Sequence, residues 1–267
     1  MGSLLHRTLE EFYKELPREE RETGIFLKQG SVMKEALHRR LEFLMTQSLL
    51  SREPLYRQKV YLDSMKKELS QFVEHEKELF MKRGFVPAYF ELKFGGPKRK
   101  GLGYLKIKDP GGDILIEGQI DRVDVEKNKG QALVIDYKRS KREFNVRAKL
   151  KKGLEFQLPI YLLAVRQLLG LEVVGAELRI LRGAFKQEGL YRESAASLLG
   201  LHPHMKVYDD LEFEGIFSRT EALVRQNLER LRRSDISVRS RSCEFCSFSS
   251  VCRFEPWRLV YSEERSS

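Results

Sequence analysis

The sequence predicts an α/β protein with a mixed central sheet flanked by helices, an N-terminal helical part and a C-terminal cysteine tail. Apolar residues recur at helical spacing over most of the first 84 residues, and residues 85–182 contain segments with strand-like alternation. Strands interleaved with helices are typical of a layered α/β domain. A chain of 267 residues can bury a full core. We expect a single domain in four parts: a helical part over 1–84, an α/β core over 85–182, an irregular segment and an Arg-rich helix over 183–240, and a cysteine tail over 241–267.

The N-terminal part contains three predicted helices, at about 4–16, 31–48 and 55–82, and Gly84 interrupts the last pattern. His38 and His75 fall outside the apolar stripes of their helices. We expect His38 on a solvated face and His75 at the surface or its boundary.

The α/β core begins with a predicted strand over 85–94 and a short one at about 104–107. A hairpin from Ile114 to about Arg139 follows, whose first strand reads as one run from Ile114 to Val125. Its polar turn, 127–130, ends in glycine.

After the hairpin, a helix is predicted from about 154 to 169, with Pro159 tolerated in its first turn. A strand from 173 to 181 comes next. Residues 185–210 show no regular pattern, and a last helix covers 218–233.

The hairpin gathers charged groups at one place. Counting outward from its turn pairs Glu126 with Gln131 and places Asp121 opposite Asp136, with Cβ atoms about 4.5–5.5 Å apart. Lys138 shares a face with Asp136, because residues i and i+2 of a strand point the same way. Two carboxylates in apolar surroundings repel each other, and a divalent cation with oxygen ligands removes that repulsion. The alternative is a solvent-facing hairpin on which Lys138 merely pairs with Asp136.

The net charge of +10 favours a polyanionic partner, nucleic acid first, although a solvated basic surface is also common. The basic segment 139–152 is either a loop beside the backbone of a substrate or a solvated connector, and Lys98–Lys100 form a second basic loop. No apolar run approaches the ~20 residues of a membrane helix, and the N-terminus lacks the apolar core of a signal peptide. We therefore expect a cytoplasmic protein without a membrane partner.

The three cysteines, Cys243, Cys246 and Cys252, lie close together, as in a metal or cluster site rather than a disulfide framework. A zinc site with His202 or His204 as fourth ligand is one alternative. Three free or buried thiols that pack the tail are another.

Four blocks taken together resemble the PD-(D/E)XK nuclease superfamily, and within it the RecB/AddB-type nuclease domain of bacterial helicase–nuclease complexes. They span most of the chain in the order of that family. The blocks are Gly2 to His6 (its GxxxH helix), Gly118 to Asp124 (G-x-x-D-R-x-D), Asp136-Tyr137-Lys138 (D-Y-K) and Gln157 to Tyr161 (QxxxY).

The resemblance implies a restriction-endonuclease-like core that holds Mg²⁺ or Mn²⁺. The metal ligands would be His6, Asp121, Asp136 and the backbone carbonyl of Tyr137. Lys138 would be the catalytic lysine beside Asp121 and Asp136, with Gln157 and Tyr161 on the substrate side. Two further carboxylates, Glu10 and Glu91, either support this site or are ordinary surface groups.

The implied activity is hydrolysis of phosphodiester bonds in DNA, as an exonuclease on single-stranded DNA in recombination and repair with a helicase partner. The alternatives are a catalytically inactive or a zinc-dependent nucleic-acid-binding module. Relatives with a 4Fe-4S cluster have a fourth cysteine just upstream of the GxxxH helix, so we expect such a cluster only with a cysteine outside this chain. The start of the chain inside the first block suggests an excised domain or a protein that has lost this ligand.

Overall fold

The computed structural model describes residues 2–96, 101–126, 130–139, 146–151, 153, 155–182, 187–202, 205–235 and 251. The chain divides into a compact unit, Met1–Glu221, and a second unit, Ala222–Ser267. The expectations for the three cysteines, His204 and the loop Lys98–Lys100 lie outside the described residues. No described helix is long and apolar enough to cross a membrane.

The three helices predicted for the N-terminal part are confirmed as α1 (Gly2–Glu15), α3 (Gly30–Thr46) and α4 (Leu55–Lys82). Between them lie the short helix α2 (Arg18–Thr23) and the 3₁₀ turns η1 (Ile25–Lys28) and η2 (Leu49–Arg52). The prediction that His38 faces solvent is wrong. Its Nε2 atom lies 3.0 Å from the Lys66 carbonyl oxygen and 3.0 Å from the Ser70 hydroxyl, both on α4. This side chain therefore ties α3 to α4.

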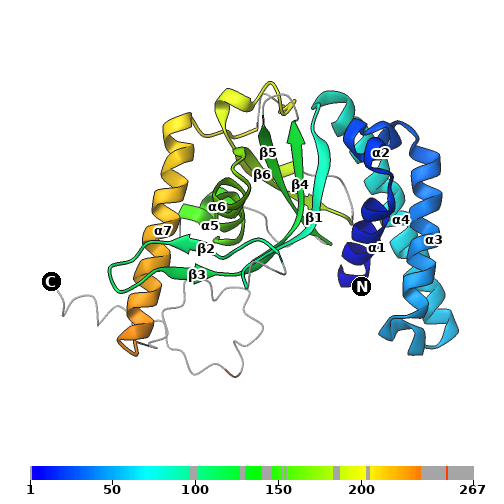
Figure 1. Ribbon diagram of the computed structural model, residues 1–267. Coiled ribbons are helices and arrows are strands. Elements are labelled where there is room, and N and C mark those ends of the chain that lie inside the picture. The colour runs from blue at the N-terminus through cyan, green and yellow to red at the C-terminus, as the bar shows by residue number, and fades with distance from the viewer. Residues whose placement is uncertain are drawn as a thin grey trace. The chain divides into compact units, whose positions relative to one another are not determined.

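A five-stranded mixed sheet forms the centre of the first unit, as the sequence predicted. Its strand order is β1-β4-β5-β6-β7, and only β5 and β6 run parallel. Helices α1, α3 and α4 lie on one side of this sheet and α6 on the other (Figure 1). The strands are β1 (Val86–Phe94), β4 (Gly118–Glu126), β5 (Gln131–Lys138), β6 (Glu172–Ile180) and β7 (Gln187–Tyr191), and α6 covers Gln157–Leu169.

The single strand predicted from Ile114 to Val125 is interrupted at Glu117. Its first three residues, β3 (Ile114–Ile116), pair with β2 (Leu105–Ile107) in a separate two-stranded sheet. Gly118 opens β4 directly beneath the ring of Phe94, where an added Cβ would lie 2.7 Å from Cζ of that ring. The break could not be found from apolar spacing, because it lies where the pairing partner changes from β2 to β1.

The segment read as irregular, 185–210, contains β7 and a 3₁₀ turn, η4 (Glu193–Ala195). The sequence of β7 is too polar to read as a strand, and it is held by antiparallel pairing with β6. Gly189 permits this pairing, since a Cβ there would lie 2.1 Å from the Ala176 carbonyl oxygen. Two helices also differ from expectation: α5 (Val146–Lys151) lies inside the basic segment, and α7 (Asp210–Arg232) begins earlier than predicted.

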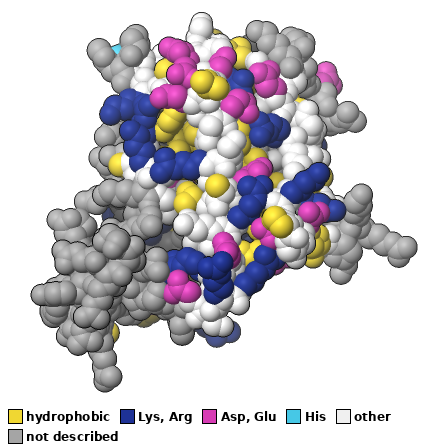
Figure 2. Space-filling model, turned by 90° about the vertical axis from the view of Figure 1, so that its left-hand side faces the viewer, with side chains coloured by type: hydrophobic (Ala, Val, Ile, Leu, Met, Phe, Trp, Pro, Cys, Tyr) yellow, Lys and Arg dark blue, Asp and Glu magenta, His cyan; other side chains and the backbone are white. Residues whose placement is uncertain are grey.

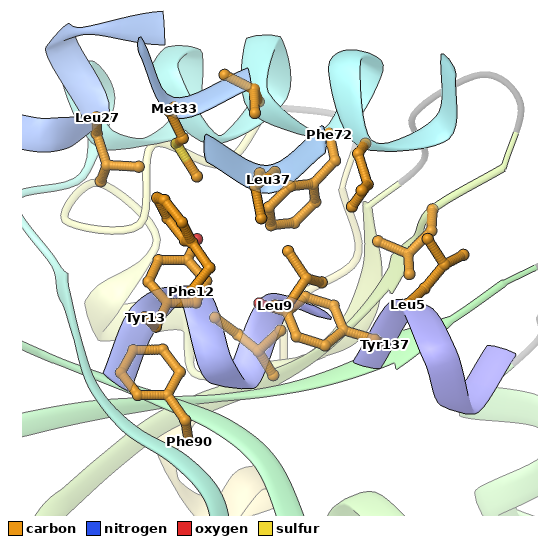
Figure 3. Close-up of a cluster of buried hydrophobic side chains, with 14 of the residues drawn as sticks. Leu5, Leu9, Phe12, Tyr13, Leu27, Met33, Leu37, Phe72, Phe90 and Tyr137 are labelled. Carbon is orange, nitrogen blue, oxygen red and sulfur yellow. The ribbon is translucent and has the colours of Figure 1, made fainter. Parts of the chain in front are cut away.

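Strand β5 is buried on both faces, which explains its continuous apolar sequence. Leu133, Ile135 and Tyr137 pack into one core with α1, α3 and α4, shown in Figure 3. Ala132 and Val134 pack into the second core, with α6. Alternation along the strand therefore places Asp136 on the α6 side of the sheet.

Candidate active site

The hairpin of β4 and β5 has the predicted register. Pairs run from Glu126↔Gln131 to Arg122↔Ile135, and the ladder ends there. At the next position the Asp121 carboxylate accepts a hydrogen bond from the backbone N–H of Tyr137, with Oδ2 2.7 Å from the nitrogen. Asp121 therefore lies at the end of the ladder, bound to the residue that follows Asp136.

His6 of α1 lies beside Asp121, although the two residues are far apart in sequence. The imidazole Nδ1 is 3.5 Å from Asp121 Oδ1. The edge of the His6 ring meets the ring of Tyr137, with centroids 5.8 Å apart and planes at 78°. Burial disfavours the charged imidazole, but the Asp121 carboxylate, together with those of Glu91 and Asp136, raises the pKa of His6 overall.

Asp136 and Lys138 meet on the face that the sequence predicted, with Lys138 Nζ 2.7 Å from Asp136 Oδ2. Gln157, the first residue of α6, links both groups. Its amide nitrogen donates to Asp136 Oδ1 at 2.8 Å, and its oxygen accepts from Lys138 Nζ at 3.0 Å. The same amide nitrogen lies 3.0 Å from the hydroxyl of Tyr161, one turn further along α6. The D-Y-K and QxxxY blocks therefore form one hydrogen-bonded group.

The surroundings of Asp136 disfavour its ionised form. Its side chain is 2% exposed, while that of Lys138 is 36% exposed. Burial, reinforced by the Asp121 carboxylate, raises the pKa of Asp136 to about 6, and Lys138 and His6 only partly offset the rise. Deprotonated Asp136 therefore lacks sufficient positive charge in its surroundings.

Glu91, which the sequence left open, joins the site from β1. Its backbone has φ of 45°, and Gln119 donates a hydrogen bond to its carboxylate. Burial raises the pKa of Glu91, and the Asp121 carboxylate adds to the rise. The pairing of β1 with β4 brings Glu91 beside Asp121, because the neighbouring pairs are Phe90↔Arg122 and Leu92↔Ile120. The sequence left the role of Glu91 open, because no motif block includes this residue. The register between β1 and β4 places it at the site.

Glu10, the other open carboxylate, pairs with Lys14 on the same helix. This exposed pair is the ordinary i,i+4 contact of a solvated helix face. Its influence on the site is electrostatic, because its charge helps to raise the pKa of Glu91.

The residues present fit a divalent cation. His6, Glu91 and Asp121 can each bring one ligand atom to within 4.8 Å of the others. Nearby, Asp136 Oδ2 is buried and, apart from its ion pair with Lys138, accepts no well-aligned hydrogen bond from the described residues. Carboxylate oxygens and an imidazole nitrogen are both common ligands of divalent metal ions in proteins. His6, Glu91, Asp121 and Asp136 could hold the ion, and their role as ligands stays a prediction, as does that of the Tyr137 carbonyl.

The basic surface is only partly described. Arg139, at the start of the basic segment, is held by the buried Glu68 of α4 through two hydrogen bonds of 3.0 and 3.2 Å. This arginine therefore pairs within the protein rather than standing free for phosphate. On the face shown in Figure 2, Lys and Arg side chains are interspersed with Asp and Glu side chains.

Comparison with known proteins identifies the family of this chain. A profile described as the PD-(D/E)XK nuclease superfamily matches residues 1–253. The chain belongs to this superfamily. The four blocks singled out in the sequence all lie within the matched range, and the mixed sheet flanked by helices fits the fold of the superfamily.

Curated relatives are named as subunits of helicase–nuclease enzymes. The exonuclease/helicase subunit RexB of Lactococcus lactis subsp. cremoris is 26% identical over 205 residues, covering 62% of this chain and 18% of that protein. An ATP-dependent helicase/deoxyribonuclease subunit of Caldanaerobacter subterraneus subsp. tengcongensis is 26% identical over 318 residues, covering 96% of this chain and 26% of that protein. The chain thus spans only about a fifth to a quarter of the length of these relatives.

Proposed function

We propose that this chain is a divalent-metal-dependent deoxyribonuclease domain that hydrolyses phosphodiester bonds, acting as an exonuclease on single-stranded DNA in recombination and repair. The observation that carries the proposal is the meeting of His6 and Asp121 beside the Asp136–Lys138 pair. Membership of a nuclease superfamily supports it.

The chemistry follows from the position of each group. A bound Mg²⁺ or Mn²⁺ would polarise a phosphoryl oxygen and lower the pKa of a water molecule. The carboxylates of Asp121, Asp136 and Glu91, with the His6 imidazole, would hold the ion. Lys138 keeps its ammonium group beside Asp136, where it stabilises negative charge that develops on the reacting phosphate. Gln157 holds both Lys138 and Asp136 in place, and Tyr161 extends this polar surface toward the substrate.

The partners in this proposal are DNA and a helicase. The curated relatives are named as helicase/nuclease subunits, which supports a helicase module in the same protein or on another chain. The net charge of +10 favours binding to the DNA backbone.

The deciding experiment is incubation with end-labelled single- and double-stranded DNA in Mg²⁺, Mn²⁺ or EDTA. We expect progressive shortening of single-stranded DNA with either metal and none in EDTA. Lys138→Met should remove cleavage and keep Mn²⁺ binding, whereas Lys106→Met, at an exposed lysine of β2, should leave both unchanged. Wild-type protein that degrades no DNA with either metal, alone or with its helicase partner, would refute the proposal.

A further inference from the structure

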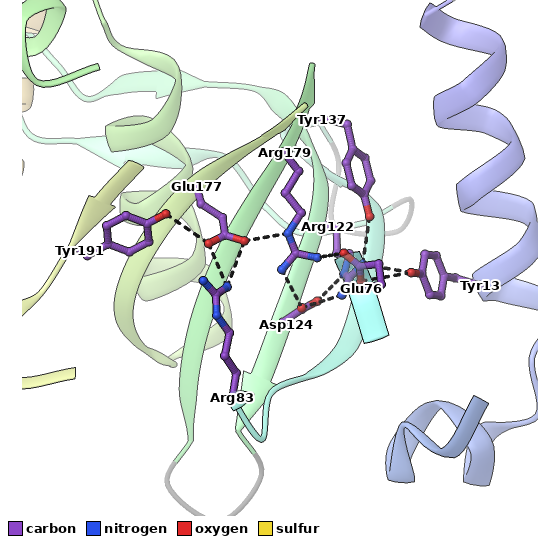
Figure 4. A network of polar contacts seen from close by, with 9 residues as sticks. All are labelled: Tyr13, Glu76, Arg83, Arg122, Asp124, Tyr137, Glu177, Arg179 and Tyr191. Carbon is purple, nitrogen blue, oxygen red and sulfur yellow. Dashed lines mark hydrogen bonds and ion pairs between the residues drawn. The ribbon is translucent and has the colours of Figure 1, made fainter. Parts of the chain in front are cut away.

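The second charged residue of the G-x-x-D-R-x-D block, Arg122, is completely buried on the side of the sheet opposite Asp136. Its guanidinium pairs with both oxygens of Asp124 at 2.5 and 2.7 Å and with Glu76 of α4 at 2.6 Å (Figure 4). The charge of Arg122 is therefore balanced within the core by Asp124 and Glu76.

Two tyrosine hydroxyls also accept hydrogen bonds from Nη1 of Arg122. They belong to Tyr13, at 3.0 Å, and Tyr137, at 3.1 Å (Figure 4). Each tyrosine leads to a different part of the candidate active site.

Tyr13 connects Arg122 to the helix that carries His6. It lies seven residues after His6 on α1, about two helical turns away. Its ring stacks on Phe90 of β1, with centroids 4.5 Å apart and planes at 8°, and the Arg122 guanidinium lies 5.1 Å from its centroid. Arg122 thus fixes α1 to the strand that contains Asp121, the residue before it.

Tyr137 connects Arg122 to the imidazole itself. Its ring touches the ring of His6, and its backbone N–H binds Asp121. The hydrogen bond from Arg122 to the Tyr137 hydroxyl restrains that ring. Two contacts therefore restrain His6 relative to Asp121. One acts through Tyr13 on the same helix, and the other through the ring of Tyr137.

We infer that Arg122 is a positioning residue, which holds His6 in place for metal binding through the hydroxyl groups of Tyr13 and Tyr137. The inference rests on the proposed function, because it assigns these hydroxyls a role in the metal site proposed above. Residues that orient metal ligands typically change metal affinity by about 10- to 100-fold when they are mutated.

Direct replacement of Arg122 would leave Asp124 and Glu76 buried and unpaired, so the test removes the hydroxyls instead. The double variant Tyr13→Phe/Tyr137→Phe keeps both rings and all carboxylate pairs of Arg122. The matched control is Tyr191→Phe. Tyr191 is similarly buried, and its hydroxyl donates to Glu177 of the same polar network at 3.2 Å rather than binding Arg122.

The readout is Mn²⁺ bound to the protein. Its dissociation constant is measured by electron paramagnetic resonance, and electron spin echo modulation detects a ¹⁴N nucleus of an imidazole ligand. We expect nitrogen modulation in wild type and Tyr191→Phe but not in His6→Ala. The double variant should lose much of the modulation and bind Mn²⁺ about tenfold more weakly, with Tyr13→Phe alone in between.

A double variant with the wild-type dissociation constant and nitrogen modulation would overturn the inference, and so would wild type without modulation. Protein that shows the modulation but cleaves no DNA would refute only the proposed function. Protein that cleaves DNA without the modulation would refute only the positioning of His6.

Discussion

Glu177 and Asp136 are buried carboxylates on neighbouring strands of one sheet, yet their surroundings shift their pKa values in opposite directions. Glu177 lies between Arg83 and Arg179, and although burial opposes ionisation, these two arginines lower its pKa to about 2. Asp136 has one partly exposed lysine as its ion partner, and burial raises its pKa to about 6.

The difference lies in the charge balance of the two groups. In the network of Figure 4, the carboxylates of Glu76, Asp124 and Glu177 face three arginines: Arg83, Arg122 and Arg179. At the candidate active site, within the described part of the chain, the carboxylates of Glu91, Asp121 and Asp136 face only Lys138 and the titratable His6. Buried carboxylates that are paired with arginines stay ionised, whereas carboxylates short of positive charge have raised pKa values and can serve as ligands of a cation.

The largest effect should come from breaking the complete group. Arg179 contacts Glu76, Glu177 and Asp124, so Arg179→Met leaves these three buried carboxylates with only Arg83 and Arg122 to balance them. We expect the free energy of unfolding in urea to fall by roughly 3–5 kcal/mol. Arg7→Met, which removes an exposed i,i+4 pair with Glu11, should cost less than about 1 kcal/mol. Equal losses in the two variants would show that the network is not a stabilising unit.

The contribution of Glu177 to the free energy of unfolding should disappear at low pH. A carboxyl group whose pKa falls on folding adds stability above its unfolded pKa, and this contribution is lost as the pH drops through its folded pKa. The change from 4.5 to about 2 corresponds to on the order of 3 kcal/mol. Glu177→Gln should therefore be less stable than wild type at pH 7, and the gap should narrow between pH 5 and pH 2 in urea titrations. Glu78→Gln, at an exposed position of α4, should run parallel to wild type.

Asp136 should change the free energy of unfolding with the opposite pH dependence when EDTA keeps the protein free of metal. A pKa raised from 3.8 to about 6 means that stability present below pH 4 is lost as the pH rises through 6. Asp136→Asn removes this penalty and also the ion pair with Lys138, so we expect a net gain of about 1–2 kcal/mol at pH 8 and little change at pH 4. A variant less stable than wild type at pH 8 would show that the site is not short of positive charge.

The smallest effect should come from adding the missing cation. At about ten times its dissociation constant, Mg²⁺ or Mn²⁺ should stabilise wild type by roughly 1.4 kcal/mol, seen as a rise in melting temperature. Asp136→Asn should gain less, because it lacks one oxygen ligand. Sodium chloride at matched ionic strength separates specific binding from screening. Equal stabilisation by the two salts would count against a metal site.

The sequence by itself determined the local parts of this protein. It predicted the three long N-terminal helices, the register of the β4–β5 hairpin, the shared face of Asp136 and Lys138, and the helix that carries Gln157 and Tyr161, although with a start at about residue 154. These features depend on spacings of a few residues, and the periods of helices and strands are visible at that range. The motif blocks added the expectation that His6 belongs with Asp121, which spacing could not supply.

Only the tertiary structure decided the rest. Glu91 reaches Asp121 because β1 pairs with β4, and β3 is separate from β4 because it pairs with β2 instead. Arg122, Glu76 and Arg179 would read as surface charges in the sequence, yet they are buried together from segments up to 103 residues apart. Burying charge is favourable only when partners from several strands and helices arrive together, and no local pattern records that cooperation.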